Sequence, residues 1–154
     1  MKKRRAKYGN RTLVRNDQSF RSELEAHTAR QLTDNGIPWT YESVEHELLP
    51  ASRSKVKVYA PKGHVMCPSF PSIRKTVYIP DFMDPDGRWA IEVKGFKTDV
   101  FQLKWKMFLA QLSATKEPPV LFLPSTKKEV NETVRIIAQL ISESEKVVHL
   151  IPST

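Results

Sequence analysis

Two β-prone segments flank a strong turn signal in the middle of the chain. Residues 77–83 and 88–94 are rich in β-branched and aromatic side chains, and Asp84-Pro85-Asp86-Gly87 separates them. Asp-Gly between two such segments is one of the strongest short-range indications of a β-hairpin. We therefore predict two antiparallel strands joined at Asp86-Gly87, with Pro85 opposite Arg88.

This register places Asp81 directly across from Glu92. The Cβ atoms of such a pair lie about 4.5–5.5 Å apart, and like charges at that separation destabilise a hairpin. A four-residue loop would keep both carboxylates on one face. Strand alternation adds Lys94 to that face and turns Ile91 and Val93 toward the core. Two interpretations stay open: a divalent cation relieves the repulsion, or the face is solvated and Lys94 neutralises Glu92.

A helix is predicted over residues 22–35, where Ser22-Glu23-Leu24-Glu25 fits a capping box and Asn35-Gly36 is a C-terminal stop signal. At 100° per residue, Glu25 lies at the edge of the apolar side, whereas Glu23 points to solvent. The helix therefore offers Glu25 as a third acid for the hairpin patch. Capping of the helix is the equally weighted alternative for Glu25.

Hydrophobic periodicity predicts the other elements of the domain. These are a strand within 39–49, a helix over 99–112, a buried strand at 120–123, a helix over 127–143 and a closing strand at 147–151. The predicted order is α-β-β-β-α-β-α-β, which is an α/β fold with a mixed central sheet flanked by helices. Residues 1–18 are expected to be a basic flexible arm, and residues 19–154 one domain with a basic insertion at about 50–75. A hairpin is one interpretation of that insertion.

The positive charge of the chain is concentrated in two segments. The net charge is +8, and all charged side chains of residues 1–16 and 51–79 are basic. This distribution favours a polyanionic partner, with a solubilising surface or a nuclear-targeting run at 2–5 as alternatives. Apolar stretches are far shorter than a membrane span, and no phosphate-cradling glycine loop is present, so neither a membrane nor a nucleotide cofactor is expected. The single cysteine, Cys67, fits a reducing cytoplasm and, with His64 alone, does not make a zinc site.

Pro80-Asp81 followed by Glu92-Val93-Lys94, with Glu25 on an earlier helix, resembles the PD-(D/E)XK nuclease superfamily. The segments 20–25, 79–82 and 92–95 look like the signature of phage endonuclease I, the enzyme that resolves Holliday junctions. Residues 94–98 and the helix that follows are similar to small phage-encoded nucleases. The resemblance covers roughly residues 20–124 and implies a restriction-endonuclease-like fold.

The resemblance also implies roles for individual residues. Asp81, Glu92 and the backbone carbonyl of Val93 match the metal ligands, Glu25 matches an acid that helps to hold a second metal, and Lys94 matches the catalytic lysine. The implied cofactor is Mg²⁺, with Mn²⁺ as a substitute. The expected DNA contacts are basic residues: Lys2, Lys3, Arg4, Arg5, Lys7, Arg11, Arg15, Arg53, Lys55, Lys57, Arg74, Lys75, Lys97 and Lys104.

These features together predict a Mg²⁺-dependent endodeoxyribonuclease that cuts branched DNA or Holliday junctions during phage recombination, replication or processing. A homodimer in the host cytoplasm is expected, since one active site of this size cuts one strand. Two alternatives on the same fold stay open, namely a catalytically silent DNA-binding module and a basic assembly factor.

Overall fold

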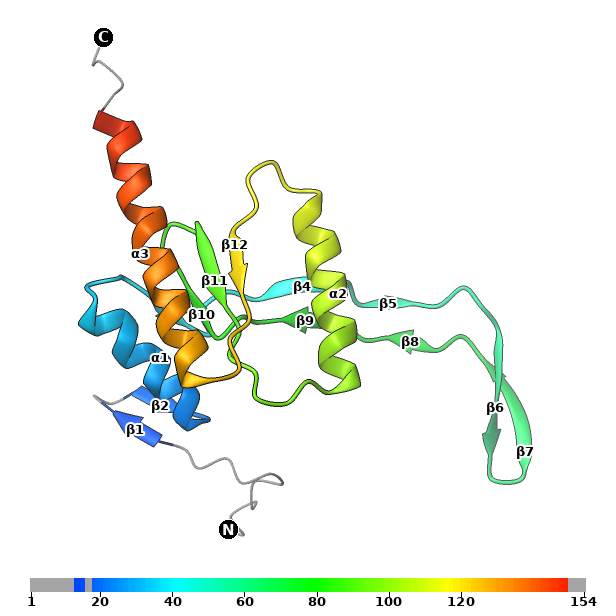
Figure 1. The fold of residues 1–154 in the computed structure, drawn as a ribbon. Helices are drawn as coiled ribbons and strands as arrows, with labels where there is room; N and C mark the ends of the chain where they lie inside the picture. The colour runs from blue at the N-terminus through cyan, green and yellow to red at the C-terminus, as the bar shows by residue number, and fades with distance from the viewer. Residues whose placement is uncertain (1–12, 16–17, 150–154) are drawn as a thin grey trace. The chain divides into compact units, whose positions relative to one another are not determined.

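The computed structural model describes residues 13–15 and 18–149, which form a mixed α/β structure (Figure 1). The chain divides into two compact units. One unit comprises the described residues within 1–43, 80–97 and 119–154, and the other comprises residues 44–79 and 98–118. No helix in the described part of the chain is long and apolar enough to cross a bilayer.

A four-stranded mixed sheet organises the first unit. Its strand order is β12 (Val120–Phe122), β11 (Trp89–Ile91), β10 (Phe82–Met83) and β3 (Thr40–Tyr41). Both neighbours of β10 are antiparallel to it, whereas β12 is parallel to β11. The parallel pairing extends beyond β11, because the Glu92 N–H donates to the Phe122 carbonyl and the Lys94 N–H to the Pro124 carbonyl.

Two helices pack together in the same unit, α1 (Glu23–Asp34) and α3 (Lys127–His149). Ser22 caps α1, since its Oγ accepts a hydrogen bond from the Glu25 N–H, as the capping-box pattern predicted. Apolar side chains of the helices and of the sheet form one core, made by Phe20, Ala29, Leu32, Ile37, Phe82, Trp89, Ile91, Val93, Val130, Val134 and Ile137. Of the predicted arm, residues 1–12 and 16–17 lie outside the described residues, and β1 (Leu13–Arg15) pairs with β2 (Gln18–Phe20), which leads directly into α1.

The central hairpin has the predicted register. Phe82 pairs with Ile91, and Met83 pairs with Ala90. The loop is longer than the predicted two residues, because the Asp84 N–H donates to the Trp89 carbonyl across a four-residue connection. Asp84 is 3% exposed and accepts hydrogen bonds from both the backbone and the guanidinium of Arg88, which closes the longer loop.

The second unit consists of a long two-stranded ribbon and one helix. Three successive antiparallel pairs form the ribbon (Figure 1): β4 (His46–Leu49) with β9 (Thr76–Tyr78), β5 (Ser52–Arg53) with β8 (Ser72–Ile73), and β6 (Val58–Lys62) with β7 (Val65–Ser69). The helix α2 (Asp99–Ser113) packs on β4 and β9, with the Phe108 ring 4.6 Å from Tyr78 and 4.7 Å from His46. The basic insertion is therefore a hairpin.

Four strand predictions differ from the structure. The strand predicted to be buried at 120–123 forms β12, but it lies at the edge of the sheet and Val120 is 45% exposed. The strand within 39–49 is divided into β3 and β4, because Glu42 adopts a positive φ of 44° that no continuous strand accommodates. The strand at 77–83 is divided likewise, into β9 and β10. The predicted closing strand at 147–151 is wrong for residues 147–149, which belong to α3, and residues 150 and 151 lie outside the described residues. Good helix formers precede Val147 and no glycine or proline interrupts them, so the helix propagates.

Candidate functional site

Asp81 and Glu92 lie at the ends of two paired strands. Asp81 immediately precedes β10, Glu92 immediately follows β11, and the register of these strands sets the two residues opposite each other. Glu92 is only 6% exposed, and its charge acts on Asp81. Ile91 and Val93 point the other way into the core, as strand alternation predicted. The fold therefore forces two carboxylates together in a poorly hydrated place.

This arrangement changes the proton affinity of Asp81. Burial is the largest cause, and repulsion by Glu92 is the second; together they raise the pKa of Asp81 to about 8. Two smaller influences oppose them, the hydrogen bond that the Val93 N–H donates to Asp81 Oδ2 at 2.7 Å and the positive charge of Lys94. Asp81 is therefore protonated at neutral pH unless a cation compensates its charge.

Lys94 lies on the same face as the two acids. Its Nζ is 3.6 Å from Glu92 Oε1, and its side chain is one-third exposed, so it contacts both the carboxylate and solvent. The backbone N–H groups of Val93 and Lys94 point in opposite directions. The Val93 N–H donates to the Asp81 carboxylate, whereas the Lys94 N–H donates to the Pro124 carbonyl. A strand residue directs its N–H and C=O to the same side. The Val93 carbonyl thus lies on the side of Asp81.

Glu25 combines the two roles that the sequence left open. It accepts hydrogen bonds from the Arg21 N–H, from Ser22 Oγ and, at 2.5 Å, from the Tyr41 hydroxyl. It is 7% exposed, and its negative charge also raises the pKa of Asp81. Three donors fill most of the acceptor positions of one carboxylate. Glu25 is accordingly better suited to fixing the charge around Asp81 than to holding a second metal by itself.

Two residues of the site, Tyr41 and Glu42, were not identified from the sequence. Burial, followed by the hydrogen bond to Glu25, raises the pKa of Tyr41, so its hydroxyl stays protonated and donates. Glu42 donates its N–H to the Asp81 carbonyl, but its positive φ directs its side chain to an ion pair with Arg21. The sequence offered one indication of these residues, the strand predicted around Tyr41. That strand prediction does not give the register between β3 and β10, which places Tyr41 beside Glu25.

The residues expected to contact DNA fall into three groups. Six of them, Lys2, Lys3, Arg4, Arg5, Lys7 and Arg11, lie outside the described residues, and Arg15 is described only as part of β1. Four more, Arg53, Lys55, Lys57 and Arg74, are exposed on the ribbon of the second unit, as is Lys75, whose Nζ pairs with Glu45 Oε1 at 2.6 Å. Lys97 is exposed after β11, and Lys104 is half-buried on α2.

The donor set fits a hard divalent cation, although the described residues do not form a complete cage. Among residues 13–15 and 18–149, no three His, Cys, Asp or Glu side chains are arranged to hold a metal. Mg²⁺ does not require such a cage, since it binds through one or two carboxylates and keeps several waters. Asp81 and Glu92, with the Val93 carbonyl on the same side, supply that minimal set of oxygens. Burial and then the charge of Glu92 raise the pKa of Asp81, so ionised Asp81 is favoured only where a cation accompanies it.

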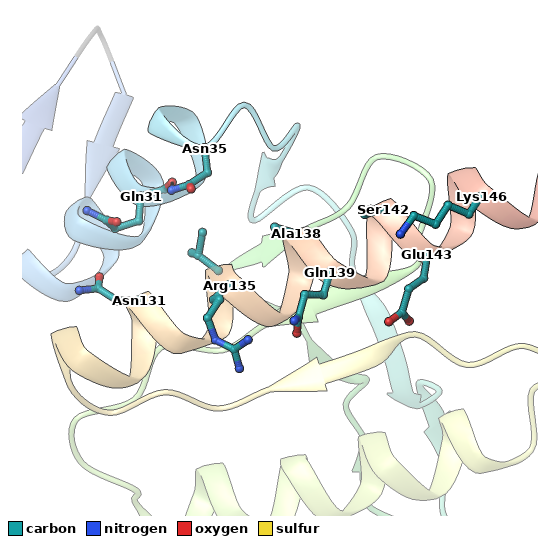
Figure 2. A pocket seen from close by; sticks show the side chains of 10 residues that line it. Gln31, Asn35, Asn131, Arg135, Ala138, Gln139, Ser142, Glu143 and Lys146 are labelled. Carbon is teal, nitrogen blue, oxygen red and sulfur yellow. Dashed lines mark hydrogen bonds between the residues drawn. The ribbon is translucent and has the colours of Figure 1, made fainter.

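A wide depression elsewhere in the first unit contains none of these groups. It has a volume of about 580 Å³ and lies between α1 and α3 (Figure 2). Gln31 of α1 and the C-cap residue Asn35 face a row of α3 side chains that includes Asn131 and Gln139. Arg135, Glu143 and Lys146 also line it, but Arg135 is held by an ion pair with Glu132, and one remaining acid does not make a metal site, so we do not assign chemistry to this depression.

Comparison of the chain with protein-family models, with curated proteins and with solved structures found no match. The α/β architecture is compatible with the fold that the sequence led us to expect, and it does not identify the family. A functional assignment therefore depends on the geometry of Asp81, Glu92 and Lys94 and on the chemistry that these groups can perform.

Proposed function

We propose that this protein is a Mg²⁺-dependent endonuclease that hydrolyses phosphodiester bonds in DNA. The observation that carries the proposal is the opposition of Asp81 and Glu92 at the ends of β10 and β11, with Lys94 on the same face. The buried Glu92 and the half-buried Asp81 cannot both carry a negative charge in this arrangement without a cost in stability, unless a cation accompanies them. A cation flanked by a lysine ammonium group suits the binding of a phosphate.

Each residue has a distinct role in the proposed reaction. Asp81 and Glu92 would hold Mg²⁺ together with the Val93 carbonyl. When bound, Mg²⁺ supplies a water molecule of lowered pKa and a positive charge beside the phosphate. Lys94, which is one-third exposed, would stabilise the phosphate oxygens on which negative charge grows in the transition state. Glu25 keeps a fixed negative charge near Asp81 through its three hydrogen bonds.

The preferred substrate in this proposal is branched DNA. The resemblance of the segments around Glu25, Asp81 and Glu92 to junction-resolving enzymes supports this choice, and exposed basic residues on the ribbon supply phosphate contacts. Because one active site cuts one strand, the resolution of a junction requires two copies of the chain. We therefore include a homodimer in the proposal.

A cleavage panel tests the proposal. The protein is incubated with four-way junction, flap, linear duplex and single-stranded DNA in Mg²⁺, Mn²⁺ or Ca²⁺. We expect cleavage in Mg²⁺ and Mn²⁺, fastest on the branched substrates, and a loss of cleavage in Glu92→Ala. No cleavage of any substrate, or cleavage that is undiminished in Glu92→Ala, removes the proposal.

Tyr41→Phe tests whether the hydrogen bond to Glu25 positions the site. The variant keeps the ring packing against Phe20 and Phe82 and removes only the hydroxyl. A hydrogen bond to a charged group is worth about 1.5–3 kcal/mol, so we expect the cleavage rate to fall roughly tenfold with little change in KM. Glu25→Gln and the double variant complete the cycle. If the fold-losses of the two single variants multiply to give the loss of the double variant, Tyr41 does not act through Glu25.

A further inference from the structure

The outer part of the ribbon, β6 and β7, exposes apolar side chains on both faces. Tyr59 is 58% exposed, Val65 64% and Met66 57%. A two-stranded hairpin without a third strand or a covering helix is only marginally stable in water. Contiguous exposed apolar residues on such an element indicate a binding surface. The question is which partner covers it.

Two prolines exclude the addition of a further strand as the mode of binding. Pro61 pairs with Met66, and Pro68 pairs with Tyr59. A proline lacks an N–H, so both pairs are of the kind whose backbone groups point outward from the ribbon. Pro61 therefore interrupts the outer edge of β6, and Pro68 that of β7. Prolines at edges are a device that prevents edge-to-edge pairing. A partner must contact the faces of the ribbon.

The charge of the ribbon favours an anionic partner over a second copy. Residues 51–79 contain six basic and no acidic side chains. Of these, Lys57 and Lys62 are exposed on or beside β6. Two such ribbons stacked face to face would repel each other, whereas a polyanion would be attracted. Exposed basic and apolar side chains on one narrow element are the combination that binds nucleic acid.

The narrow tip of the ribbon suits a groove. The turn between β6 and β7 contains only Gly63 and His64, and of these two residues only Gly63 has a positive φ, of 67°. That combination is typical of a type II′ turn, which keeps the two strands close together as far as the tip. The major groove of B-form DNA, about 12 Å wide, admits a two-stranded ribbon. In duplex RNA the major groove is too narrow for side chains to read.

We propose that the β6–β7 ribbon enters the major groove of B-form duplex DNA. This inference rests on the proposed nuclease function and specifies how a duplex arm of the branched substrate is held. The face made by Tyr59, Pro61, Met66 and Pro68 supplies apolar contacts to base edges, among them thymine methyl groups. Lys57 and Lys62 contact the phosphates that border the groove.

Binding measured by fluorescence anisotropy in EDTA tests the inference. The probes are a duplex DNA, a duplex RNA of the same sequence, the DNA carrying glucosylated hydroxymethylcytosine in its major groove, and the DNA saturated with netropsin in its minor groove. We expect duplex DNA and netropsin-bound DNA to bind alike, and duplex RNA and glucosylated DNA to bind at least about tenfold more weakly. Weakening by netropsin but not by glucosylation overturns the inference.

Variants provide the second half of the test. Lys57→Ala with Lys62→Ala should lower the slope of log affinity against log salt by about 2, since each phosphate contact contributes about 0.9. Tyr59→Ala should weaken binding to duplex DNA several-fold without a change in that slope. Lys128→Ala, an exposed lysine on α3, is the matched control and should leave both quantities unchanged. Equal behaviour of the ribbon variants and the control overturns the inference.

The two proposals fail in distinguishable ways. A wild-type protein that cleaves no DNA in Mg²⁺ contradicts the nuclease function, whatever the ribbon binds. Cleavage of duplex DNA that continues at the wild-type rate and affinity in Tyr59→Ala and in the double lysine variant contradicts only the ribbon inference. A concentration-dependent dimer that Tyr59→Ala and Met66→Ala abolish, with DNA affinity unchanged, assigns the ribbon to a second copy and overturns the inference too.

Discussion

The variant Asp81→Asn is expected to lose about 10²–10³-fold in cleavage rate and to gain stability when divalent cations are absent. The loss follows because an amide is a poor ligand for Mg²⁺ and carries no charge to hold it. The gain is expected at about pH 8 and above, where Asp81 loses its proton, because the amide is not repelled by Glu92 and its oxygen still accepts the hydrogen bond from the Val93 N–H. Cleavage assays and urea unfolding in EDTA measure the two effects.

The stability gain of Asp81→Asn should depend on pH in a defined direction. The pKa of Asp81 is raised to about 8 in the folded protein and is about 3.9 in an unfolded chain. Between these values the folded state binds a proton that the unfolded state does not. The free energy of unfolding of the wild type should therefore fall as pH rises through this window, by at most about 1.4 kcal/mol per pH unit.

The amide of Asp81→Asn does not titrate, so this part of the pH dependence should vanish in the variant. Asp86→Asn is the control, since Asp86 is an exposed acid in the loop of the same hairpin. It should retain both the cleavage rate and the pH dependence of the wild type. If Asp81→Asn is instead less stable than the wild type at pH 8 in EDTA, the two carboxylates do not repel each other and the proposed site has no physical basis.

The second large effect is expected for Lys94→Met. Methionine keeps most of the length of the lysine stem and removes the ammonium group that lies 3.6 Å from Glu92. We expect kcat to fall about a hundredfold, because removal of one group that stabilises transition-state charge costs about 10²–10³-fold. Metal affinity should stay the same or increase, since Glu92 loses a competing cation. Single-turnover cleavage together with Mn²⁺ binding separates these two quantities.

Lys97→Met is the matched control for Lys94→Met. Lys97 is three residues further along the chain and is exposed. Its substitution should weaken DNA binding slightly at low salt and leave the single-turnover rate unchanged. A Lys94→Met variant that cleaves as fast as Lys97→Met would show that Lys94 only neutralises Glu92, which is the alternative that the sequence left open.

Local patterns predicted the parts of the fold that local interactions determine. Ser22 and Asn35-Gly36 bound the first helix because caps satisfy backbone groups within a few residues. The hairpin register followed from the turn between its strands, even though the loop proved longer. The division of the predicted strand 39–49 at Glu42 was not predicted, because the alternation of side chains does not indicate where a strand is interrupted. The end of α3 was also missed, because valine is compatible with both a helix and a strand.

The candidate site was predictable to the extent that it lies on one hairpin. Asp81 and Glu92 face each other because strand pairing is local in sequence, and Lys94 follows by alternation. Tyr41 was not predictable as a partner of Glu25, because that contact joins a helix and a strand whose separation depends on the packing of the whole unit. The ion pair between Glu42 and Arg21 was not predictable either, because the positive φ of Glu42 cannot be read from the sequence.

Isothermal titration of the protein with Mg²⁺ at pH 7, repeated in buffers of different ionisation enthalpy, tests the central claim most directly. Since Asp81 is protonated at this pH, binding of the cation should release close to one proton, and the release should decline above about pH 8. Asp81→Asn should bind no cation at this site. An absence of binding heat in the wild type, or binding that is equally strong in Asp81→Asn, would contradict a cation site built on these two carboxylates.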